Sequence, residues 1–256
     1  MLRIYPLYSG SSGNSTLVRS DNCNILIDVG LGYKTTLSVL KAHNLSPEDI
    51  SAIVVTHEHV DHIGGICQFV RRCPVKVYAP SKIVGMVAER AMYSEVYGVD
   101  GRFDVGDLTA DVYKCSHDSA ACVGYRFTDG RDSVASVTDT GCTNSLLVDF
   151  LAPCHTVQLE SNHDVDMLKN GPYPYQLKRR ILSDVGHLSN AQAAEVLRQL
   201  AGSNVKKVIL AHLSEHNNTA ELAFRAAVDA YADKGLYEGR DIDVYVAAKR
   251  DNKVTE

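Results

Sequence analysis

The sequence lacks any pair of cysteines at C-x-x-C spacing, although it contains seven cysteines in 256 residues. An odd number of cysteines without this motif argues against a disulfide framework and against a zinc site built from cysteine. We therefore interpret the cysteines as reduced, mostly buried thiols and expect a cytoplasmic protein.

Long apolar runs and an excess of positive charge are also missing. No stretch approaches the roughly 18 apolar residues of a membrane-spanning helix, and the apolar part of the opening MLRIYPLYSGSSG is too short and broken for a signal peptide. We expect no membrane association. Because the formal net charge is −5, a nucleic acid would have to bind at a local site and not over a general basic surface.

What is present is an ordinary globular composition, 45% hydrophobic and 22% charged. Without a linker, repeat or low-complexity tract, one domain spanning residues 1–256 is expected. Apolar runs such as NILIDVG and DISAIVVT predict strands covered on both faces. Strands are predicted at 2–8, 15–19, 24–28, 50–55, 75–79, 111–115, 122–127, 133–138, 155–160, 205–211 and 242–247. Helices are predicted at 34–43, 64–72, 81–93, 189–200 and 218–233. This α/β (α+β) pattern predicts sheets packed face to face with helices outside.

The stretch VVTHEHVDHIGG (54–65) places His57, His59, Asp61 and His62 directly after an apolar strand. Any one histidine could be an ordinary hydrogen-bonded imidazole. Four such groups beside a core are costly unless something compensates them, and a bound cation would do so. His57 and His59 are two positions apart in an extended segment, so they project the same way. The H-x-H-x-D-H string therefore predicts a metal site.

Three further candidate ligands end apolar, strand-like runs elsewhere in the chain: His117, Asp139 and His212. The ends of strands are where sheets place functional loops. Histidine and aspartate without cysteine suit zinc, manganese or iron and discriminate poorly among them. We expect two divalent metal ions.

With these residues, the sequence from NILIDVG to LAHLSEH resembles the metallo-β-lactamase superfamily. The resemblance implies an αββα sandwich with a dinuclear site at one edge. It assigns His57, His59 and His117 to one ion, Asp61, His62 and His212 to the other, and Asp139 to both. Asp61 is counted among the catalytic residues as well. Asp28 resembles the aspartate that supports the ligands from behind, although a structural strand-end aspartate is the alternative.

The stretch RRILSDVGHLSNAQAAEVLRQL resembles the segment of ribonuclease Z and related phosphodiesterases in which a histidine precedes a helix. The resemblance implies that His187 is a general acid and that Glu160 hydrogen-bonds it and keeps it protonated. Ser189 and the adjacent helix amides would hold a phosphate, because a helix N-terminus attracts anions. The alternative for His187 is a histidine of no consequence at a helix start.

Spacing narrows the resemblance further. Only 21 residues separate His117 from Asp139 and 72 separate Asp139 from His212. The first gap has no room for the tRNA-binding arm of ribonuclease Z, nor the second for the inserted domain of the β-CASP nucleases. The strings SGSSGNS, THEHVDHIGG, SVTDTG, LESNHD and LKRRILSDVGHLSN resemble the compact YycJ/WalJ group instead. This resemblance implies a 5′→3′ exonuclease on DNA, with a metal-bridging hydroxide as the nucleophile.

Other functions stay open. A thioester hydrolase of the glyoxalase II kind would use the same metals without needing His187. A metal-stabilised binding protein without turnover would need an incomplete ligand set, and all seven ligands are present. We expect no obligate protein partner.

Two segments could contact the substrate. In the loop from Ser9 to Ser15, Ser12 and Asn14 could help to wrap a phosphate with backbone amides, although a tight hairpin turn is the alternative. The run Lys178-Arg179-Arg180 is the only triple basic run in this acidic chain. Arg179 and Arg180 could clamp a DNA backbone, or simply form a solvated charged face.

Overall fold

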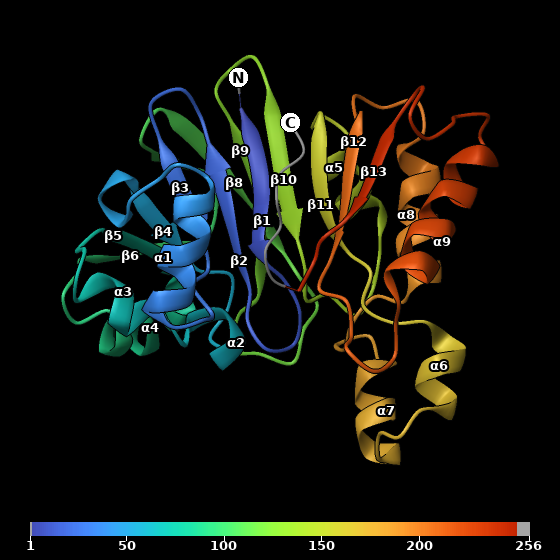
Figure 1. Cartoon of the computed structure of the whole chain (residues 1–256), viewed down its shortest axis with the longest axis horizontal. Helices are drawn as coiled ribbons and strands as arrows, with labels where there is room; N and C mark the ends of the chain where they lie inside the picture. The colour runs from blue at the N-terminus through green and yellow to red at the C-terminus, as the bar shows by residue number, and fades with distance from the viewer. Residues whose placement is uncertain (1, 250–256) are drawn as a thin grey trace.

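The computed structural model describes residues 2–249. Two β-sheets pack face to face, and helices cover the outer face of each sheet (Figure 1). The predicted αββα sandwich is confirmed.

The first sheet is built from the first six strands in sequence order. Pairing is antiparallel between β1, β2 and β3 and parallel from β3 to β6. Its strands are β1 (Arg3–Tyr8), β2 (Ser15–Arg19), β3 (Asn24–Ile27), β4 (Ala52–Val54), β5 (Lys76–Pro80) and β6 (Val96–Val99).

The second sheet has the order β13-β12-β11-β10-β9-β8-β7. Pairing is parallel from β10 to β13 and antiparallel from β7 to β10. Its strands are β7 (Phe103–Val105), β8 (Leu108–Lys114), β9 (Val123–Thr128), β10 (Ser133–Val137), β11 (Thr156–Glu160), β12 (Lys207–Ala211) and β13 (Asp243–Val246).

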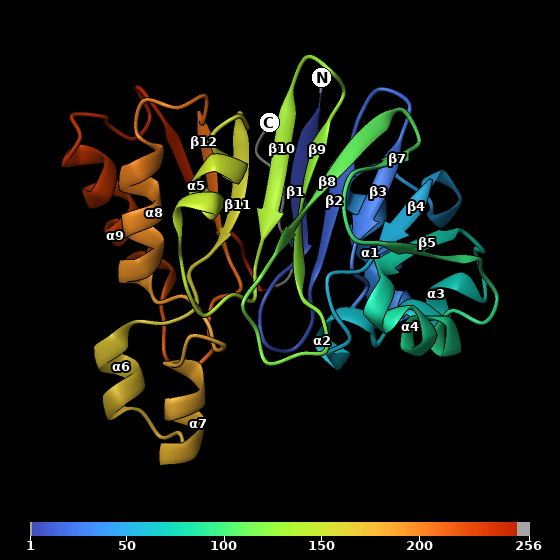
Figure 2. The ribbon, with the colours of Figure 1, turned by 180° about the vertical axis from the view of Figure 1, so that it is seen from behind.

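The helices fall into three groups (Figures 1 and 2). Those beside the first sheet are α1 (Tyr33–Ala42), α2 (Val60–Ile63), α3 (Ile66–Val70) and α4 (Val84–Arg90), with single 3₁₀ turns at Pro47–Asp49 and Ser81–Ile83. Those beside the second sheet are α5 (Ser145–Leu151), α8 (Asn190–Leu200) and α9 (Ala220–Ala232). The last two, α6 (Val165–Asn170) and α7 (Tyr175–Ile181), project from the body beyond one edge of the sheets. No helix in residues 2–249 is both long and apolar enough to cross a membrane.

Alternation of side chains along the strands divides the interior into three layers. In β3, Leu26 packs into the cluster under the helices of the first sheet, whereas Ile25 and Ile27 face the second sheet. Successive strand residues point to opposite faces, so a continuous apolar run is needed where both faces are covered. Across the central layer, Thr16 and Gln158 also hydrogen-bond through their side chains at 3.1 and 3.0 Å.

The structure contains elements that the sequence patterns did not predict. These are strands β6 and β7 and the short helices α2, α5, α6 and α7. Each has seven residues or fewer, which is too short for a hydrophobic period to stand out. The predicted helices at 64–72 and 81–93 are shorter in the structure, as α3 and α4.

Candidate metal centre

The seven predicted ligands come together at one edge of the two sheets, on loops that begin where strands end. Strand β4 leads to His57, His59, Asp61 and His62, β8 to His117, β10 to Asp139, and β12 to His212. Four strands from both sheets thus contribute to a single site. The sandwich explains how residues more than 150 positions apart in the sequence become neighbours.

The first loop turns sharply after His59, which ends the extended segment and precedes the single turn of α2. The paired glycines that follow allow this loop to pack against the loop after β3. A Cβ at Gly65 would lie 1.9 Å from the carbonyl oxygen of Leu31, so any larger residue there would clash with backbone. The turn carries Asp61 and His62 back towards His57.

Three residues at strand ends adopt a backbone conformation that is rare for residues other than glycine. Asp28, Asp139 and His212 have φ angles of 61°, 58° and 59°. Such left-handed residues cost free energy and persist where the surrounding structure determines them, which is common at functional sites. For His212, the backbone N–H donates to Ser9 Oγ at 2.8 Å and the carbonyl accepts from Asn162 Nδ2 at 2.8 Å.

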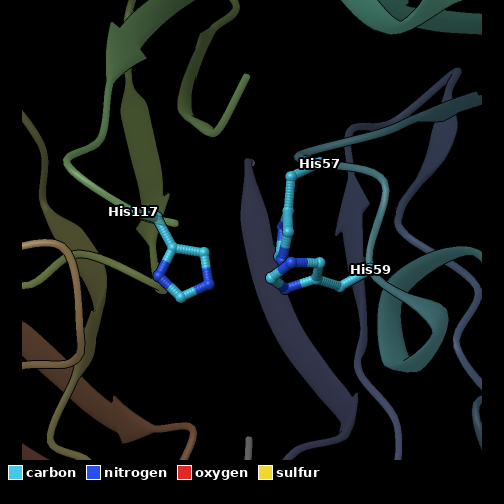
Figure 3. Close-up of side chains that lie close together, drawn as sticks. All are labelled: His57, His59 and His117. Atoms are coloured by element: carbon cyan, nitrogen blue, oxygen red, sulfur yellow. The ribbon is translucent and has the colours of Figure 1, made fainter. Parts of the chain in front are cut away.

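His57, His59 and His117 form the first group of candidate ligands (Figure 3). The ring centroid of His57 lies 4.6 Å from that of His59 and 5.2 Å from that of His117. The centroids of His59 and His117 are also 5.2 Å apart. The three imidazoles reach one point from two directions, two from the β4 loop and one from the β8 loop.

Asp61, His62 and His212 form the second group. Oδ2 of Asp61 lies 3.5 Å from Nε2 of His62 and 3.8 Å from Nε2 of His212. Their ligand atoms all lie within 4.8 Å of one another.

Asp139 lies between the two groups. Its Oδ2 is 3.4 Å from Nε2 of His62, and its Oδ1 is 3.9 Å from Nε2 of His117 and 3.5 Å from Nε2 of His212. The carboxylate therefore faces histidines of both groups, as a bridging ligand must.

Four of the histidines are oriented by contacts at Nδ1. His62 Nδ1 lies 2.7 Å from Asp28 Oδ2, and His212 Nδ1 lies 3.0 Å from Glu160 Oε1. His117 Nδ1 is 3.1 Å from the Gly186 carbonyl, and His57 Nδ1 is 3.0 Å from Thr56 Oγ1. Each partner oxygen can accept a hydrogen bond from Nδ1–H, which leaves Nε2 to supply the lone pair to a metal.

Asp28 supports two of these histidines, His62 and His57. Its Oδ2 also accepts from Thr56 Oγ1 at 2.7 Å, while its Oδ1 accepts from the Thr56 backbone N–H at 2.8 Å. The carboxylate thus fixes His62 directly and His57 through the threonine hydroxyl. Its place behind the ligands agrees with the supporting role that the resemblance implies.

The site fits metal ions on the chemistry of its atoms. His57 Nε2, His212 Nε2 and Asp139 Oδ2 are buried and have no hydrogen-bond partner within the described chain. Unpaired buried polar atoms are rare because each costs free energy. Nitrogen and oxygen donors in overlapping groups suit two divalent ions of the zinc, manganese or iron kind.

The buried charges determine which groups carry protons. Burial alone would lower the pKa of His62, but the carboxylates of Asp139 and Asp28 raise it to about 10. Burial and the neighbouring His62 lower the pKa of His57 well below its usual value. His57 is therefore neutral and ready to coordinate, whereas His62 must lose a proton first.

Glu160 and His187 lie beside the ligands. Oε1 of Glu160 is 2.8 Å from Nδ1 of His187, and Oε2 accepts from the backbone N–H groups of Thr140 and Leu188 at 2.9 and 3.2 Å. Burial alone would raise the pKa of this fully buried carboxyl, but the adjacent His187 lowers it to about 2. Glu160 is therefore ionised and satisfied by hydrogen bonds, so it orients histidines and leaves coordination to the other carboxylates.

Comparison with known proteins places this site in a family. Residues 8–212 match the sequence profile of the metallo-beta-lactamase superfamily. The chain is 38% identical over 248 residues to the exodeoxyribonuclease WalJ of Streptococcus pneumoniae, covering 93% of this chain and 91% of that protein. It is 35% identical over 246 residues to the exodeoxyribonuclease YycJ of Bacillus anthracis, covering 93% and 92%. The chain belongs to the metallo-β-lactamase superfamily.

Two other similarities are looser. A hydroxyacylglutathione hydrolase of Xylella fastidiosa is 41% identical over 68 residues, which is 25% of this chain and 24% of that protein. The metallo-β-lactamase fold protein YhfI of Bacillus subtilis superposes with a TM-score of 0.75 at 16% identity, covering 97% of each chain. The similarity to YhfI shows the fold alone, whereas the matches to WalJ and YycJ over 93% of this chain support a WalJ/YycJ-like member of the superfamily.

The metallo-β-lactamase site opens into a cavity of about 240 Å³. Predicted site residues that line it are His59, Asp61, His117, Asp139, Arg180, His187 and His212. His57 and His62 are buried beneath them, with 0% and 1% of their surface exposed. The cavity is thus open to a substrate directly over both groups of ligands.

Several residues that we expected to contact substrate lie elsewhere. Ser189 is buried and caps α8, where its hydroxyl is engaged with Gln192 in a capping box. The amide of Asn14 contacts Asp61 Oδ2 at 3.3 Å and His62 Nε2 at 3.1 Å, behind the cavity wall. Both side chains support the site and do not line the cavity. Ser12 is exposed outside the lining.

The two arginines predicted to contact DNA, Arg179 and Arg180, have different surroundings. Arg180 lines the cavity but forms a bidentate ion pair with Asp118, the neighbour of His117. Arg179 is exposed on α7, 5.9 Å from the ring centroid of Tyr175. Only Arg179 keeps a charge that no carboxylate within the described residues neutralises.

Sequence reasoning missed six lining residues: Ser11, Asn162, Tyr173, Leu177, Ile181 and Ser214. Ser11 and Asn162 lie within strings already singled out, but only the folded chain shows which member of each string faces the cavity. Tyr173, Leu177 and Ile181 come from the α6–α7 segment, for which no structure was predicted.

Proposed function

We propose that this protein is a metal-dependent exodeoxyribonuclease that removes nucleotides from the 5′ end of DNA. The observation that carries the proposal is the Glu160–His187 pair, 2.8 Å apart, on the rim of a seven-ligand site. A positioned acid is what a phosphodiester needs and a thioester does not, because an alkoxide leaves poorly without a proton. The names of the full-length relatives, exodeoxyribonucleases WalJ and YycJ, support DNA as the substrate.

His57, His59 and His117 would hold one ion, Asp61, His62 and His212 the other, and Asp139 both. Zinc or manganese suits this donor set, and iron is also compatible. When bound, the ions would lower the pKa of water to produce a nucleophile near neutral pH and would neutralise phosphate charge. Asp61 also lines the cavity, where a carboxylate of this group would be accessible to the reacting phosphate and to the nucleophile.

His187 protonates the departing oxygen from Nε2, since its Nδ1 is taken by Glu160. The hydrogen bond to Glu160 fixes the orientation of the ring and leaves Nε2 as the nitrogen that can face the substrate. The same oxygen of Glu160 contacts His212 Nδ1 at 3.0 Å, so one carboxylate sets the position of the acid relative to a metal ligand. Preorganisation of this kind spares reorientation during the reaction.

The chain's thiols support a cytoplasmic location as part of this proposal. All seven cysteines are free, which is usual in the reducing environment of the cytosol.

The test is incubation of the purified protein with DNA and RNA labelled at either end, single- and double-stranded, in the presence of Mn²⁺ or Zn²⁺. We expect mononucleotides to be released from the 5′ end of DNA. Hydrolysis of S-lactoylglutathione without cleavage of any nucleic acid would overturn the proposal in favour of a thioesterase.

A further inference from the structure

Helices α6 and α7 form an arm, residues 165–181, that stands out from the sandwich next to the cavity (Figures 1 and 2). Tyr173, Leu177 and Arg180 of this arm line the cavity. A substrate that extends out of the cavity on this side must run along α7.

The surface of the arm combines an exposed aromatic ring with positive charge. Tyr175 is 74% exposed, the largest exposed fraction among the exposed large hydrophobic residues described. Residues 165–181 contain four basic side chains (Lys169, Lys178, Arg179, Arg180) and one acidic one, Asp166. With Arg180 paired to Asp118, the arm keeps a net charge of +2 in a chain of −5. Positive charge is thus concentrated beside the site in a protein that is acidic elsewhere.

Tyr175 and Arg179 occupy adjacent turns of α7, with the guanidinium 5.9 Å from the ring centroid. An exposed ring backed by a free arginine matches the surfaces that bind single-stranded nucleic acid, where bases stack on aromatic rings and cations contact phosphates. An extended strand has unpaired bases that can stack, whereas a duplex hides its base faces.

The arm is fixed to the loops of the site at its start, its middle and its end. Just before α6, the Asp164 N–H donates to the Asn217 carbonyl at 2.8 Å, and between α6 and α7, Tyr173 packs edge-on against His216 with centroids 5.8 Å apart. At the other end Arg180 pairs with Asp118, whose N–H donates to the Val185 carbonyl at 3.0 Å. These contacts reach the loops of His212 and His117. A fixed arm binds without an ordering cost.

We propose that the α6–α7 arm holds the single-stranded part of the substrate as it leaves the cavity. Tyr175 stacks on a base, and Lys178 and Arg179 contact phosphates. The inference rests on the proposed function and adds to it a substrate class, DNA that is single-stranded beyond the scissile bond.

The chain offers a matched control. Tyr237 is 52% exposed, and the Arg240 guanidinium lies 4.5 Å from its ring centroid. This second tyrosine–arginine pair precedes β13, which runs parallel to β12 towards the metal centre. It therefore lies at the opposite edge of the sheet, far from the cavity.

The experiment compares Tyr175→Ala with Tyr237→Ala on 5′-phosphorylated single-stranded DNA of about 12 nucleotides and on a dinucleotide too short to reach the arm. Stacking on an aromatic side chain contributes about 5- to 150-fold in affinity. We expect Tyr175→Ala to raise KM for the longer DNA by such a factor, with kcat unchanged and little effect on the dinucleotide. Tyr237→Ala should match the wild type on both.

Binding of the same DNA, followed by fluorescence anisotropy against salt concentration, tests the charge. Loss of one phosphate contact lowers the slope of log K against log salt by about 0.7 for single strands. Arg179→Ala should show this loss and Arg240→Ala should not.

Equal KM values for the two tyrosine variants, on DNA that the wild type cleaves, would overturn the proposed role of the arm. The proposed nuclease activity would still stand. Equal loss on the dinucleotide and the longer DNA would also overturn it, because the damage would then lie in the site. A wild type that neither cleaves nor binds DNA would overturn both.

Discussion

Oε1 of Glu160 lies 2.8 Å from Nδ1 of His187 and 3.0 Å from Nδ1 of His212. One carboxylate oxygen therefore orients both the proposed acid and a proposed metal ligand. Changing Glu160 should disturb both metal binding and the transfer of a proton to the leaving oxygen. Changing His187 should disturb the proton transfer alone. This difference separates the two roles experimentally.

Asp28 gives a prediction for metal affinity. Asp28→Asn should weaken metal binding by about 10- to 100-fold, the usual effect of removing an outer partner of a ligating histidine. Oδ2 of Asp28 faces both His62 Nδ1 and the Thr56 hydroxyl, and Oδ1 accepts from the Thr56 backbone N–H. In asparagine one of these two positions becomes an NH2 donor, so the acceptor set that holds His62 and Thr56 is incomplete. Competition against a chromophoric chelator measures the affinity. An unchanged affinity would mean that Asp28 merely ends its strand.

Asp139 gives a prediction for stoichiometry. Asp139→Ala should bind fewer than two ions per chain and lose phosphodiester hydrolysis, because the carboxylate faces histidines of both groups. Elemental analysis of the purified variant counts the metal. Asp229→Ala, on the exposed side of α9, is the control. Two ions in the Asp139 variant would contradict a bridging role.

Proton release on metal binding follows from the pKa of His62, raised to about 10 in the metal-free chain. At pH 7 this imidazole carries a proton that a metal must displace, so metal affinity should rise as pH increases. Calorimetric titration with Zn²⁺ in buffers of different ionisation enthalpy reveals the protons released. Zinc binding with no release at pH 7 would show that His62 is already neutral.

The cluster of candidate ligands could be predicted from the sequence because each of its residues stands in a recognisable local pattern. His57, His59, Asp61 and His62 share one short string, and His117, Asp139 and His212 each end an apolar run. The fold could be predicted for the same reason, since a continuous apolar run such as Ile25-Leu26-Ile27 indicates a strand that is buried on both faces.

The roles of residues that depend on contacts with distant parts of the chain could not be predicted from local sequence patterns. Ser189 looked like a phosphate contact but caps α8, and Asn14 looked like part of a flexible loop but supports Asp61 and His62. Arg180 looked free and is paired with Asp118. The arm itself, with short helices around Gly171 and two prolines, has no hydrophobic period to reveal it.

The central claim is that His187 donates a proton to a poor leaving group. A positioned acid contributes about 10²- to 10⁴-fold to such a step, whereas a nitrophenolate hardly needs the proton. His155, whose Nδ1 pairs with the Asp132 carboxylate away from the metal centre, provides a matched control. The decisive measurement is the rate of His187→Ala and His155→Ala on DNA and on bis(p-nitrophenyl) phosphate, at equal metal content. We predict that His187→Ala loses about 10²- to 10⁴-fold on DNA and little on the nitrophenyl ester, while His155→Ala loses neither activity. Equal loss on both substrates, or none, would contradict the role of His187 and reopen the thioesterase alternative.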